Sequence, residues 1–454
     1  MKTFLSTFLA IPVCLCLASA QEQPKPAPNF AALGRTVVIQ LALRQFDKVA
    51  AQFDERIAEA LPQAKLAESW DKLVAQAGTL KGIRSVRVAP LQSNQLVTLT
   101  CAFEKATLDA KIAFRADGRI GGLSFVPSES EETPSDWAAP DYAKPSSFHE
   151  QPATVADGQW ELPATLTLPA GNGPFPAIVL VHGSGPHDRD ETIGPNKPFK
   201  DLAWGLASRG MAVLRYTKRT LKYSGESSVD PTAFTVKDET IDDARAAVAL
   251  LAHQPNIDPK RIFFLGHSLG GYLAPRIAAE DPQIAGIIVM AGNTRPIEQL
   301  IVEQVRYMAG REGKISEEDQ KHIDAAEEVA RQIESPELKP GTSVNVLGSI
   351  TPSSYWLDLR GYQPAAIAAG LKIPVLVIQG GRDYQVGEAD FEGWKKALDG
   401  HANATLKFYP SLNHLFIAGT GPSSPGEYAR PGHVSPEVVQ DIAAWVTAAE
   451  RPAK

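Results

Sequence analysis

The chain has 454 residues, which at about 100–200 residues per domain predicts two or three domains. Hydrophobic residues make up 44% of it and charged residues 21%, which is typical of a globular protein with a full core. The formal net charge is -7, and this mild acidity argues against nucleic acid or an anionic membrane surface as a partner.

An export signal is predicted over residues 1–20. Lys2 supplies a positive start, the stretch from Phe4 to Leu17 is mostly apolar, and Ala18-Ser19-Ala20 matches a small-residue cleavage site. The apolar run is short for a membrane-spanning helix, and no other segment is long enough to cross a bilayer. We therefore expect cleavage after Ala20 and a periplasmic or secreted mature protein.

A small α+β domain is predicted over residues 21–126. Its first part, residues 31–80, places apolar side chains at helical spacing. An α+β domain is indicated because helices are followed by antiparallel strands. There is no histidine between residues 21 and 148, so we expect no catalytic cluster here; a docking role and a stabilising role both remain open. Four stretches with the two-residue period of strands follow the helices, at 83–88, 95–103, 107–114 and 120–125.

Residues 127–147 are predicted to be a linker between two domains. The stretch is polar and charged at its start, and it contains prolines at positions 127, 134, 140 and 145. We therefore place the start of the second domain at residue 148.

The second domain, residues 148–454, alternates strands with helices. Continuous apolar runs such as 177–181 indicate strands that are buried on both faces. The alternation predicts the α/β class, with a doubly wound, mostly parallel sheet. Strands are predicted at 153–155, 160–168, 177–181, 211–216, 261–265, 284–290, 374–378 and 405–409. Helices are predicted at 201–209, 238–253 and 269–279, and from Pro436 with Ser435 as N-cap.

Residues 293–355 interrupt this alternation with a helical, charged stretch between two core strands. An insertion at this point of the chain lies where a cap would cover the site. Both a mobile lid and a passive helical insertion are consistent with the sequence.

The motif Gly266-x-Ser268-x-Gly270 lies between a predicted strand and a predicted helix. This context is that of a nucleophile elbow, in which a tight turn lifts the serine hydroxyl above the carboxyl edge of a sheet. The two glycines allow the strand and the helix to approach closely. The backbone amide of Leu269, at the helix N-terminus, is then directed at the position where an oxyanion would form.

The acid and the base of a serine hydrolase are predicted from the order of the strands. Asp383 follows the strand 374–378 by a glycine-rich turn, so it lies near the carboxyl edge of the sheet. Of the three later histidines, His401 precedes a strand and His433 precedes the last helix, whereas His414 follows the carboxyl end of the strand 405–409. We therefore predict Asp383 and His414 as the partners of the serine.

The roles of these residues follow from their chemistry. His414 would take the proton of Ser268 as the serine attacks a carbonyl carbon, and Asp383 would hold the imidazole and stabilise its charged form. The oxyanion would accept hydrogen bonds from the amide of Leu269 and from one in the loop after the strand 177–181, which we assign to Ser184.

Other charged residues and histidines lie beside these positions in the sequence. Arg382 is a candidate counter-ion for Asp383, and Lys218-Arg219 is a candidate contact for an acidic substrate. We expect His267 to be a buried packing residue and His182 to orient the loop that follows it.

Four blocks of sequence carry a family resemblance. From about residue 148 to its end, the chain resembles an α/β-hydrolase of the bacterial serine-esterase and dienelactone-hydrolase-like group, whose triad runs in the order Ser, acid, His. The first domain resembles the small domain of unknown function that often precedes exported bacterial α/β-hydrolases. The blocks are His182-Gly183-Ser184-Gly185-Pro186, Gly266-His267-Ser268-Leu269-Gly270-Gly271, Gln379-Gly380-Gly381-Arg382-Asp383-Tyr384-Gln385-Val386 and Asn413-His414-Leu415-Phe416.

The residues and the resemblance together predict a serine esterase, which cleaves carboxylic esters through an acyl-enzyme. They imply no metal and no organic cofactor, and a small-molecule ester or short peptide as the substrate. An exported peptidase remains an alternative, because related families include aminopeptidases and the cap is rich in acidic residues. A non-catalytic binding protein is a third interpretation, against which the intact Ser268, Asp383 and His414 argue.

Overall fold

The computed structural model describes residues 29–91, 94–128, 137–223, 233–311, 313–346 and 349–449. The predicted export signal and part of the predicted linker lie outside these residues. The described chain forms one antiparallel sheet of four strands, one mixed sheet of eight strands and a two-stranded hairpin.

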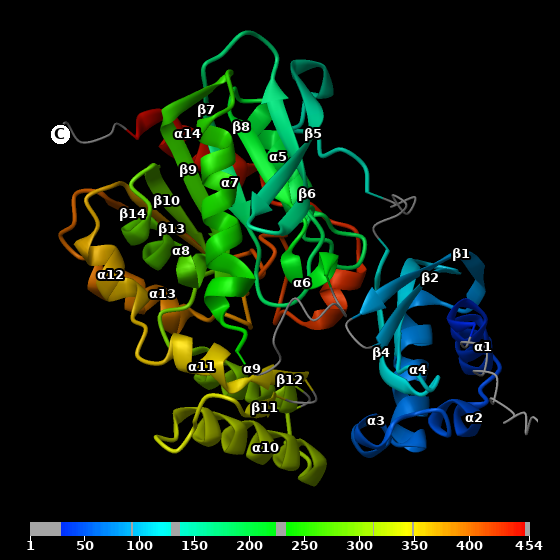
Figure 1. The fold of residues 1–454 in the computed structure, drawn as a ribbon. Helices are drawn as coiled ribbons and strands as arrows, with labels where there is room; N and C mark the ends of the chain where they lie inside the picture. Colours follow the sequence, from blue (N-terminus) through cyan, green and yellow to red (C-terminus); the bar gives the residue numbers. More distant parts are fainter. Residues whose placement is uncertain are drawn as a thin grey trace, which may run out of the picture.

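The first unit packs four helices against the four-stranded antiparallel sheet (Figure 1). Val38 and Leu41 on the first helix meet Val97 and Leu99 on the second strand, and all four side chains are fully buried. The expected order of helices and then strands is therefore observed. The elements are α1 (Phe30–Ala42), α2 (Phe46–Ala50), α3 (Glu55–Ala60), α4 (Gln63–Ala77), β1 (Leu80–Leu91), β2 (Asn94–Phe103), β3 (Thr107–Phe114) and β4 (Ile120–Pro127).

The described end of the predicted linker is attached to the second unit. Trp137 packs edge-to-face on Trp204, with ring centroids 5.0 Å apart, and its indole N–H donates to Asp201 at 2.8 Å. Tyr142 donates its hydroxyl hydrogen to the carbonyl of Val434 at 2.9 Å. From residue 137 onward, the chain thus lies against the unit that carries the larger sheet.

The eight-stranded sheet has the order β14-β13-β10-β9-β7-β8-β6-β5. The strands from β14 to β8 pair in parallel, and β6 and β5 pair antiparallel at one edge. A doubly wound, mostly parallel sheet is therefore confirmed. The strands are β5 (Phe148–Asp157), β6 (Trp160–Pro169), β7 (Phe175–Val181), β8 (Ala212–Tyr216), β9 (Ile257–His267), β10 (Ile284–Met290), β13 (Val375–Gly380) and β14 (Ala404–Tyr409).

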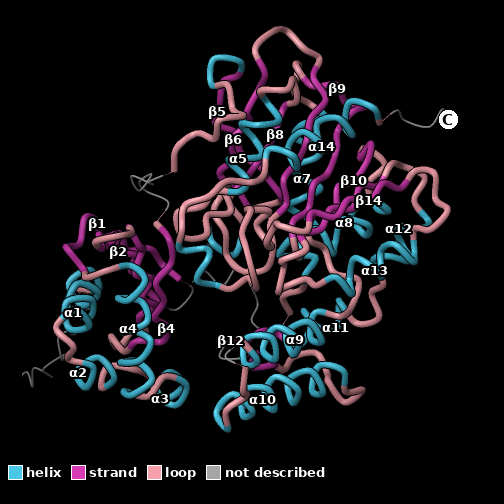
Figure 2. The backbone as a smooth tube through the Cα atoms, turned by 180° about the vertical axis from the view of Figure 1, so that it is seen from behind, coloured by secondary structure: helices cyan, strands magenta, loops and turns pink. Residues whose placement is uncertain are grey.

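Helices cover both faces of this sheet (Figure 2). Alternate residues of each strand serve the two faces: Val179 and Phe264 belong to one core cluster, whereas Leu180 and Phe263 belong to the other. On the first face lie α7 (Asp242–Ala252), α8 (Leu269–Glu280), α12 (Pro364–Gly370) and α13 (Glu388–Ala397). On the second face lie α5 (Pro198–Ala207) and α14 (Pro436–Ala448). Shorter helical turns are η1 (Pro145–Ser147), α6 (Arg219–Lys222), η2 (Lys237–Ile241) and η3 (Pro425–Ala429).

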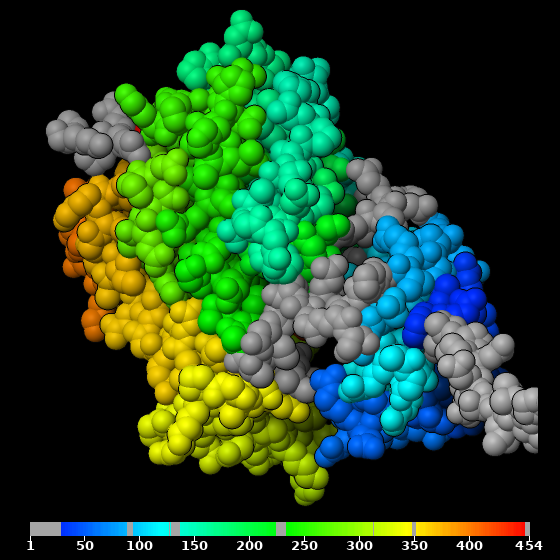
Figure 3. Space-filling model, in the orientation of Figure 1, coloured from blue at the N-terminus to red at the C-terminus, as the bar shows by residue number. Residues whose placement is uncertain are grey.

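The insertion between β10 and β13 is helical at its start, as the sequence predicts, and this part forms two helices. Val302 on the first of them packs with Ala326 and Ala330 on the second. The chain then forms a short antiparallel hairpin, which the sequence pattern does not indicate. In the space-filling view, this cap and the first unit form two projections beside the body of the larger sheet (Figure 3). The cap comprises α9 (Ile297–Gly310), α10 (Glu317–Glu334), β11 (Ser343–Val346), β12 (Ser349–Pro352) and α11 (Ser353–Leu359).

Across the described ranges, no helix combines the length and the apolarity that a bilayer crossing requires.

Candidate active site

Ser268 is the single residue between the end of β9 and the start of α8. Its backbone has φ 52° and ψ -115°, a region that non-glycine residues rarely occupy. The strain is held by hydrogen bonds on both sides: its N–H donates to the carbonyl of Met290 at 2.9 Å, and its carbonyl accepts from the amide of Tyr272 at 2.8 Å. This geometry is that of the predicted elbow.

The glycines of the motif are required by close approaches of the backbone. A Cβ atom on Gly266 would lie 2.1 Å from the carbonyl oxygen of Gly270, and one on Gly270 would lie 2.3 Å from that of Val181. Both distances are far shorter than any real contact, so a side chain at either position would force the strand and helix apart.

Asp383 and His414 meet at the carboxyl edge of the sheet. Asp383 follows β13 and His414 follows β14, and these strands are parallel neighbours. His414 Nδ1 lies 2.6 Å from Asp383 Oδ2, and the two residues are 4% and 7% exposed. A carboxylate at this distance holds the imidazole with its Nδ1–H directed at the acid and leaves Nε2 available as a base.

The carboxylate of Asp383 is fixed by further donors. Its Oδ1 accepts from the amides of Gln385 at 2.8 Å and Val386 at 3.0 Å, and its Oδ2 accepts from Gln379 Nε2 at 3.2 Å. These hydrogen bonds fix the orientation of the Asp383 carboxylate, and its contact with Nδ1 in turn fixes the orientation of the His414 ring.

His267, the residue before Ser268, contacts His414. The ring nitrogen Nε2 of His267 lies 3.0 Å from the carbonyl oxygen of His414, and the two rings are 4.7 Å apart between centroids. The hydroxyl of Ser268 itself makes no hydrogen bond with His414 or with any other described residue. Catalytic hydrogen bonds are often long before substrate binds and shorten in the complex.

Two backbone amides lie beside the serine without an acceptor. The amides of Leu269 and Ser184 donate no hydrogen bond within the described part of the chain. The loop that carries Ser184 passes close to the hydroxyl, because a Cβ atom on Gly183 would lie 3.6 Å from Ser268 Oγ. Unpaired amides next to a nucleophile are the donors that an oxyanion needs.

A buried glutamate next to this loop was not predicted from the sequence. Glu191 Oε1 accepts from the amide of Gly183 at 2.7 Å, and Glu191 Oε2 forms an ion pair with His267 Nδ1 at 2.9 Å. Burial opposes charge on both groups, but their mutual attraction outweighs it. It raises the pKa of His267 and lowers the pKa of Glu191 to about 2. His267 therefore connects the loop that carries Glu191 with the loop that carries His414, and it is not only a packing residue.

His182 anchors the same loop, as expected. Its ring Nε2 lies 2.9 Å from the carbonyl oxygen of Asp188, and the residue is buried. Burial lowers the pKa of His182 to about 3, so its ring is neutral and donates one hydrogen bond there.

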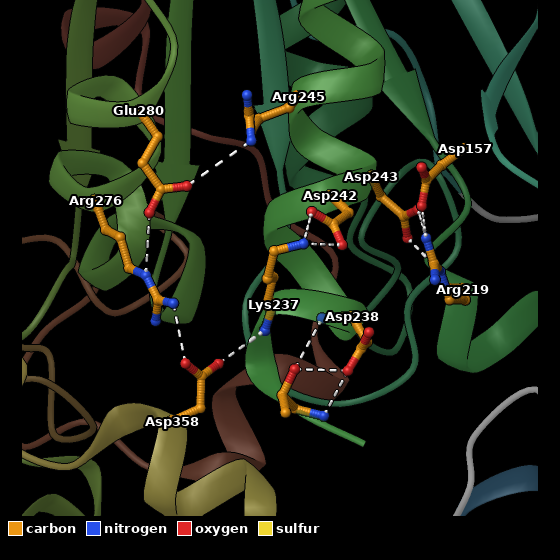
Figure 4. A network of polar contacts seen from close by, with 11 residues as sticks. Asp157, Arg219, Lys237, Asp238, Asp242, Asp243, Arg245, Arg276, Glu280 and Asp358 are labelled. Atoms are coloured by element: carbon orange, nitrogen blue, oxygen red, sulfur yellow. Dashed lines mark hydrogen bonds and ion pairs between the residues drawn. The ribbon is translucent and has the colours of Figure 1, made fainter. Parts of the chain in front are cut away.

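The two cations that were candidates for contact with an acidic substrate are buried instead. Lys218 is 2% exposed and forms an ion pair with Glu239 at 2.9 Å. Arg219 is bound by the carboxylates of Asp243 and Asp157 (Figure 4). With these partners, neither side chain is available to a substrate.

Arg382 does not serve Asp383 as a counter-ion. Its guanidinium forms an ion pair with Glu427, and its Nε donates to the carbonyl of Gly421 at 2.7 Å. Arg382 therefore points toward η3 and the loop before it, and its contacts attach this region to the turn that carries Asp383.

His433 pairs with Asp201 at 3.1 Å, at the start of the final helix. Within the described ranges, no group of three or more His, Cys, Asp or Glu side chains is arranged to hold a metal ion.

Known proteins resemble both units of this chain. Residues 173–419 match the family model described as serine aminopeptidase, S33, and residues 35–123 match a family of unknown function, DUF3887. The first match spans the strands and loops that carry Ser268, Asp383 and His414.

Individual relatives differ widely in similarity. The esterase EstD of Thermotoga maritima is 38% identical over 409 residues, which cover 90% of this chain and 93% of that protein. The polyketide transferase ATR5 of Stachybotrys chlorohalonatus is 27% identical over 221 residues, 45% of this chain and 70% of that protein. Among solved structures, Est1E from Butyrivibrio proteoclasticus is 17% identical with a TM-score of 0.43, over 65% of this chain and 99% of that one.

Proposed function

Because the chain belongs to the α/β-hydrolase family described as serine aminopeptidase, S33, and is 38% identical to EstD over 90% of its length, we infer that it is a serine hydrolase of carboxylic esters. We assign Ser268 as the nucleophile, His414 as the base and Asp383 as the acid that orients the base. The observation that carries this assignment is the 2.6 Å contact between Asp383 and His414 at the same sheet edge as the strained Ser268.

The reaction follows in two halves. Ser268 Oγ attacks the ester carbonyl carbon while His414 Nε2 takes its proton, and the carbonyl oxygen becomes an oxyanion held by the amides of Leu269 and Ser184. The intermediate collapses, the carbon–alkoxy bond breaks, and His414 returns the proton to the leaving alcohol. Water then attacks the acyl-enzyme, gives its proton to His414, and releases the acid as Ser268 recovers its hydrogen.

The test is the release of nitrophenol from short-chain acyl esters by the mature protein. Ser268→Ala should abolish release and labelling by a fluorophosphonate, whereas Ser411→Ala, which changes an exposed serine, should leave both unchanged. Full activity in Ser268→Ala would overturn the assignment of the nucleophile. Turnover without labelling of the wild-type enzyme would overturn the acyl-enzyme, and labelling without turnover would favour a binding protein.

A peptidase is the second candidate, and the family description favours it. Such enzymes bind the amine of a peptide with acidic side chains, and the cap helix α9 carries Glu298 and Glu303. Glu303 already pairs with Arg295 at 2.6 Å, which removes one of these acids as an amine site. We therefore expect acyl esters to be turned over faster than aminoacyl-anilides of the same acyl size, and the reverse preference would favour the peptidase.

We further propose that the enzyme is exported and that its signal is cleaved after Ala20. Support comes from the sequence of residues 1–20 alone. Expression of the full chain in a bacterial host, followed by mass measurement of the periplasmic fraction, should give a mature protein that begins at Gln21.

A further inference from the structure

Lys218 holds the loop that carries the proposed oxyanion donor. Its side chain is almost fully buried, and Nζ donates to the carbonyl of Gly183 at 2.8 Å. Its backbone amide donates to the carbonyl of His187 at 3.0 Å, so Lys218 forms two hydrogen bonds with the loop.

The bond to Gly183 acts directly on the neighbouring amide. The carbonyl of Gly183 and the N–H of Ser184 belong to the same planar peptide, and in a trans peptide the two groups point in opposite directions. A cation that fixes the carbonyl therefore fixes the direction of the Ser184 N–H. It also polarises the peptide, because a charged donor binds an acceptor more strongly than a neutral one.

The same lysine is connected to the cap. Lys218 pairs with Glu239 at 2.9 Å, and the other carboxylate oxygen of Glu239 accepts from the hydroxyl of Tyr355 at 2.7 Å. Glu239 lies in η2 and Tyr355 in α11, which directly follows the cap hairpin. All three side chains are buried, so the chain of contacts is shielded from solvent.

We propose that Lys218 is a positioning residue that aims the Ser184 amide at the oxyanion, and that Glu239 and Tyr355 make its position depend on the cap. The proposal rests on the proposed function, because it takes the Ser184 amide as an oxyanion donor. Lys218 does not touch the substrate; it acts through the Gly183–Ser184 peptide.

The test removes the buried pair together, as Lys218→Met with Glu239→Gln, so that no unpaired charge remains. We expect kcat for a nitrophenyl ester to fall by on the order of 10²-fold with KM nearly unchanged, because the lost interaction matters in the transition state. The affinity for a trifluoromethyl ketone, whose adduct with Ser268 carries an oxyanion, should fall by a similar factor.

The matched control is the neighbouring buried pair, as Arg219→Met with Asp243→Asn (Figure 4). Among the described residues, the side chains of Arg219 and Asp243 form no hydrogen bond or ion pair with the loop, so this variant should lose comparable thermal stability while keeping its kcat and inhibitor affinity. An equal loss of kcat in both double variants would overturn the proposal, because it would reduce the effect to stability. A kcat within about threefold of the wild-type value in the Lys218/Glu239 variant would overturn it as well.

Two single variants keep the test valid if the double variant does not fold. Lys218→Arg retains the charge and should keep more activity than the double variant. Tyr355→Phe removes only a hydroxyl and should lower kcat by about three- to tenfold at unchanged KM. Wild-type kcat in Tyr355→Phe would overturn the link to the cap, and loss of activity in Lys218→Arg equal to that of Ser268→Ala would overturn positioning by charge. Failure of the proposed function can be distinguished from failure of this proposal. It would show as absent ester turnover in the wild-type enzyme or as retained turnover in Ser268→Ala.

Discussion

At the scale of single residues, the elbow depends on the absence of two side chains. Gly266 and Gly270 let β9, α8 and the end of β7 approach within backbone contact, and this approach holds Ser268 at φ 52°. The strained serine is thus maintained by packing that surrounds it and not by its own preference.

Gly266→Ala should therefore destabilise the protein by about 3 kcal/mol or more, because the added methyl would lie 2.1 Å from a backbone oxygen. Denaturant unfolding measures the change, and esterase activity should be lost with it. Gly310→Ala is the control: nothing lies within 4 Å of its Cβ position, so the same substitution should be neutral or slightly stabilising. Equal effects at the two positions would contradict this explanation.

The ion pair of Glu191 and His267 predicts a stability that depends on pH. The pKa of Glu191 is about 2 in the folded state, below its usual 4.5, so its contribution is full above pH 4.5 and lost as the pH falls toward 2. The pKa of His267 is raised, so its contribution is full below pH 6.5 and lost as the pH rises through the raised value. Glu191→Gln should therefore lower the free energy of unfolding most at about pH 5–6, by on the order of 3 kcal/mol.

Unfolding of both proteins in denaturant between pH 3 and pH 9 tests this prediction. The difference between them should shrink at both ends of the range. Glu392→Gln, which removes a half-exposed ion pair with Lys395, should change stability by less than about 1 kcal/mol throughout. A constant difference across the range for Glu191→Gln would rule out the ion pair as its source.

Residues that a motif or a strand end marks can be predicted from this sequence, whereas residues whose role is defined only by the fold cannot. The carboxyl ends of β13 and β14 place Asp383 and His414 together because neighbouring parallel strands end at one edge. Glu191 belongs to no such pattern, and its positive φ and its partner in β9 arise from tertiary packing. The sequence suggests Lys218 as a contact for an acidic substrate because its carboxylate partner, Glu239, lies on a different element and no pattern marks the pair.

At the scale of elements, α10 is the most exposed helix of the cap, and its stability depends on the capping of its N-terminus. Its N-cap, Ser316, accepts from the amide of Asp319, and the side chain of Asp319 accepts from the amide of Ser316 in return. Three acidic residues in the first turn also suit the helix dipole.

Ser316→Ala should lower the stability of α10 by about 1 kcal/mol. The amide of Asp319 loses its acceptor, and the Asp319 carboxylate that accepts from the amide of residue 316 loses the hydroxyl that orients it. Protection of the α10 amides from hydrogen exchange should decrease, while that of α8 in the sheet unit stays the same. Ser316→Asn retains a capping oxygen and should restore most of the protection. Unchanged exchange in Ser316→Ala would show that α10 is held by packing on α9 alone.

Elements with a strong period were predicted well, and short ones were not. The predicted strand 284–290 coincides with β10, and the apolar runs at 177–181 and 261–265 lie inside β7 and β9. The hairpin β11–β12 has only four residues in each strand, too few to show a two-residue period. The turn η2 before α7 continues the same helical pattern, so its π geometry carries no separate signal.

At the scale of the whole molecule, the two units have separate cores. Among the described residues, the core of the first unit consists of side chains between Phe30 and Phe125, and the two cores of the larger sheet begin at Tyr142. Between the units, the described residues include a hydrogen bond from Lys111 Nζ to the carbonyl of Leu221 at 3.2 Å. Cores that share no side chain are expected to unfold independently.

Leu99→Ala tests this independence, because Leu99 is fully buried in the first core. It should destabilise the first unit by about 2–5 kcal/mol and move only one of two transitions in a calorimetric scan. Ester hydrolysis below that transition should keep its wild-type rate, since Ser268, Asp383 and His414 all lie in the other unit. Ile288→Ala, at an equally buried position between the two halves of the site, should instead move the second transition and reduce activity at high temperature. If Leu99→Ala shifts both transitions together, or lowers kcat at a temperature where the protein is folded, the two cores are not independent.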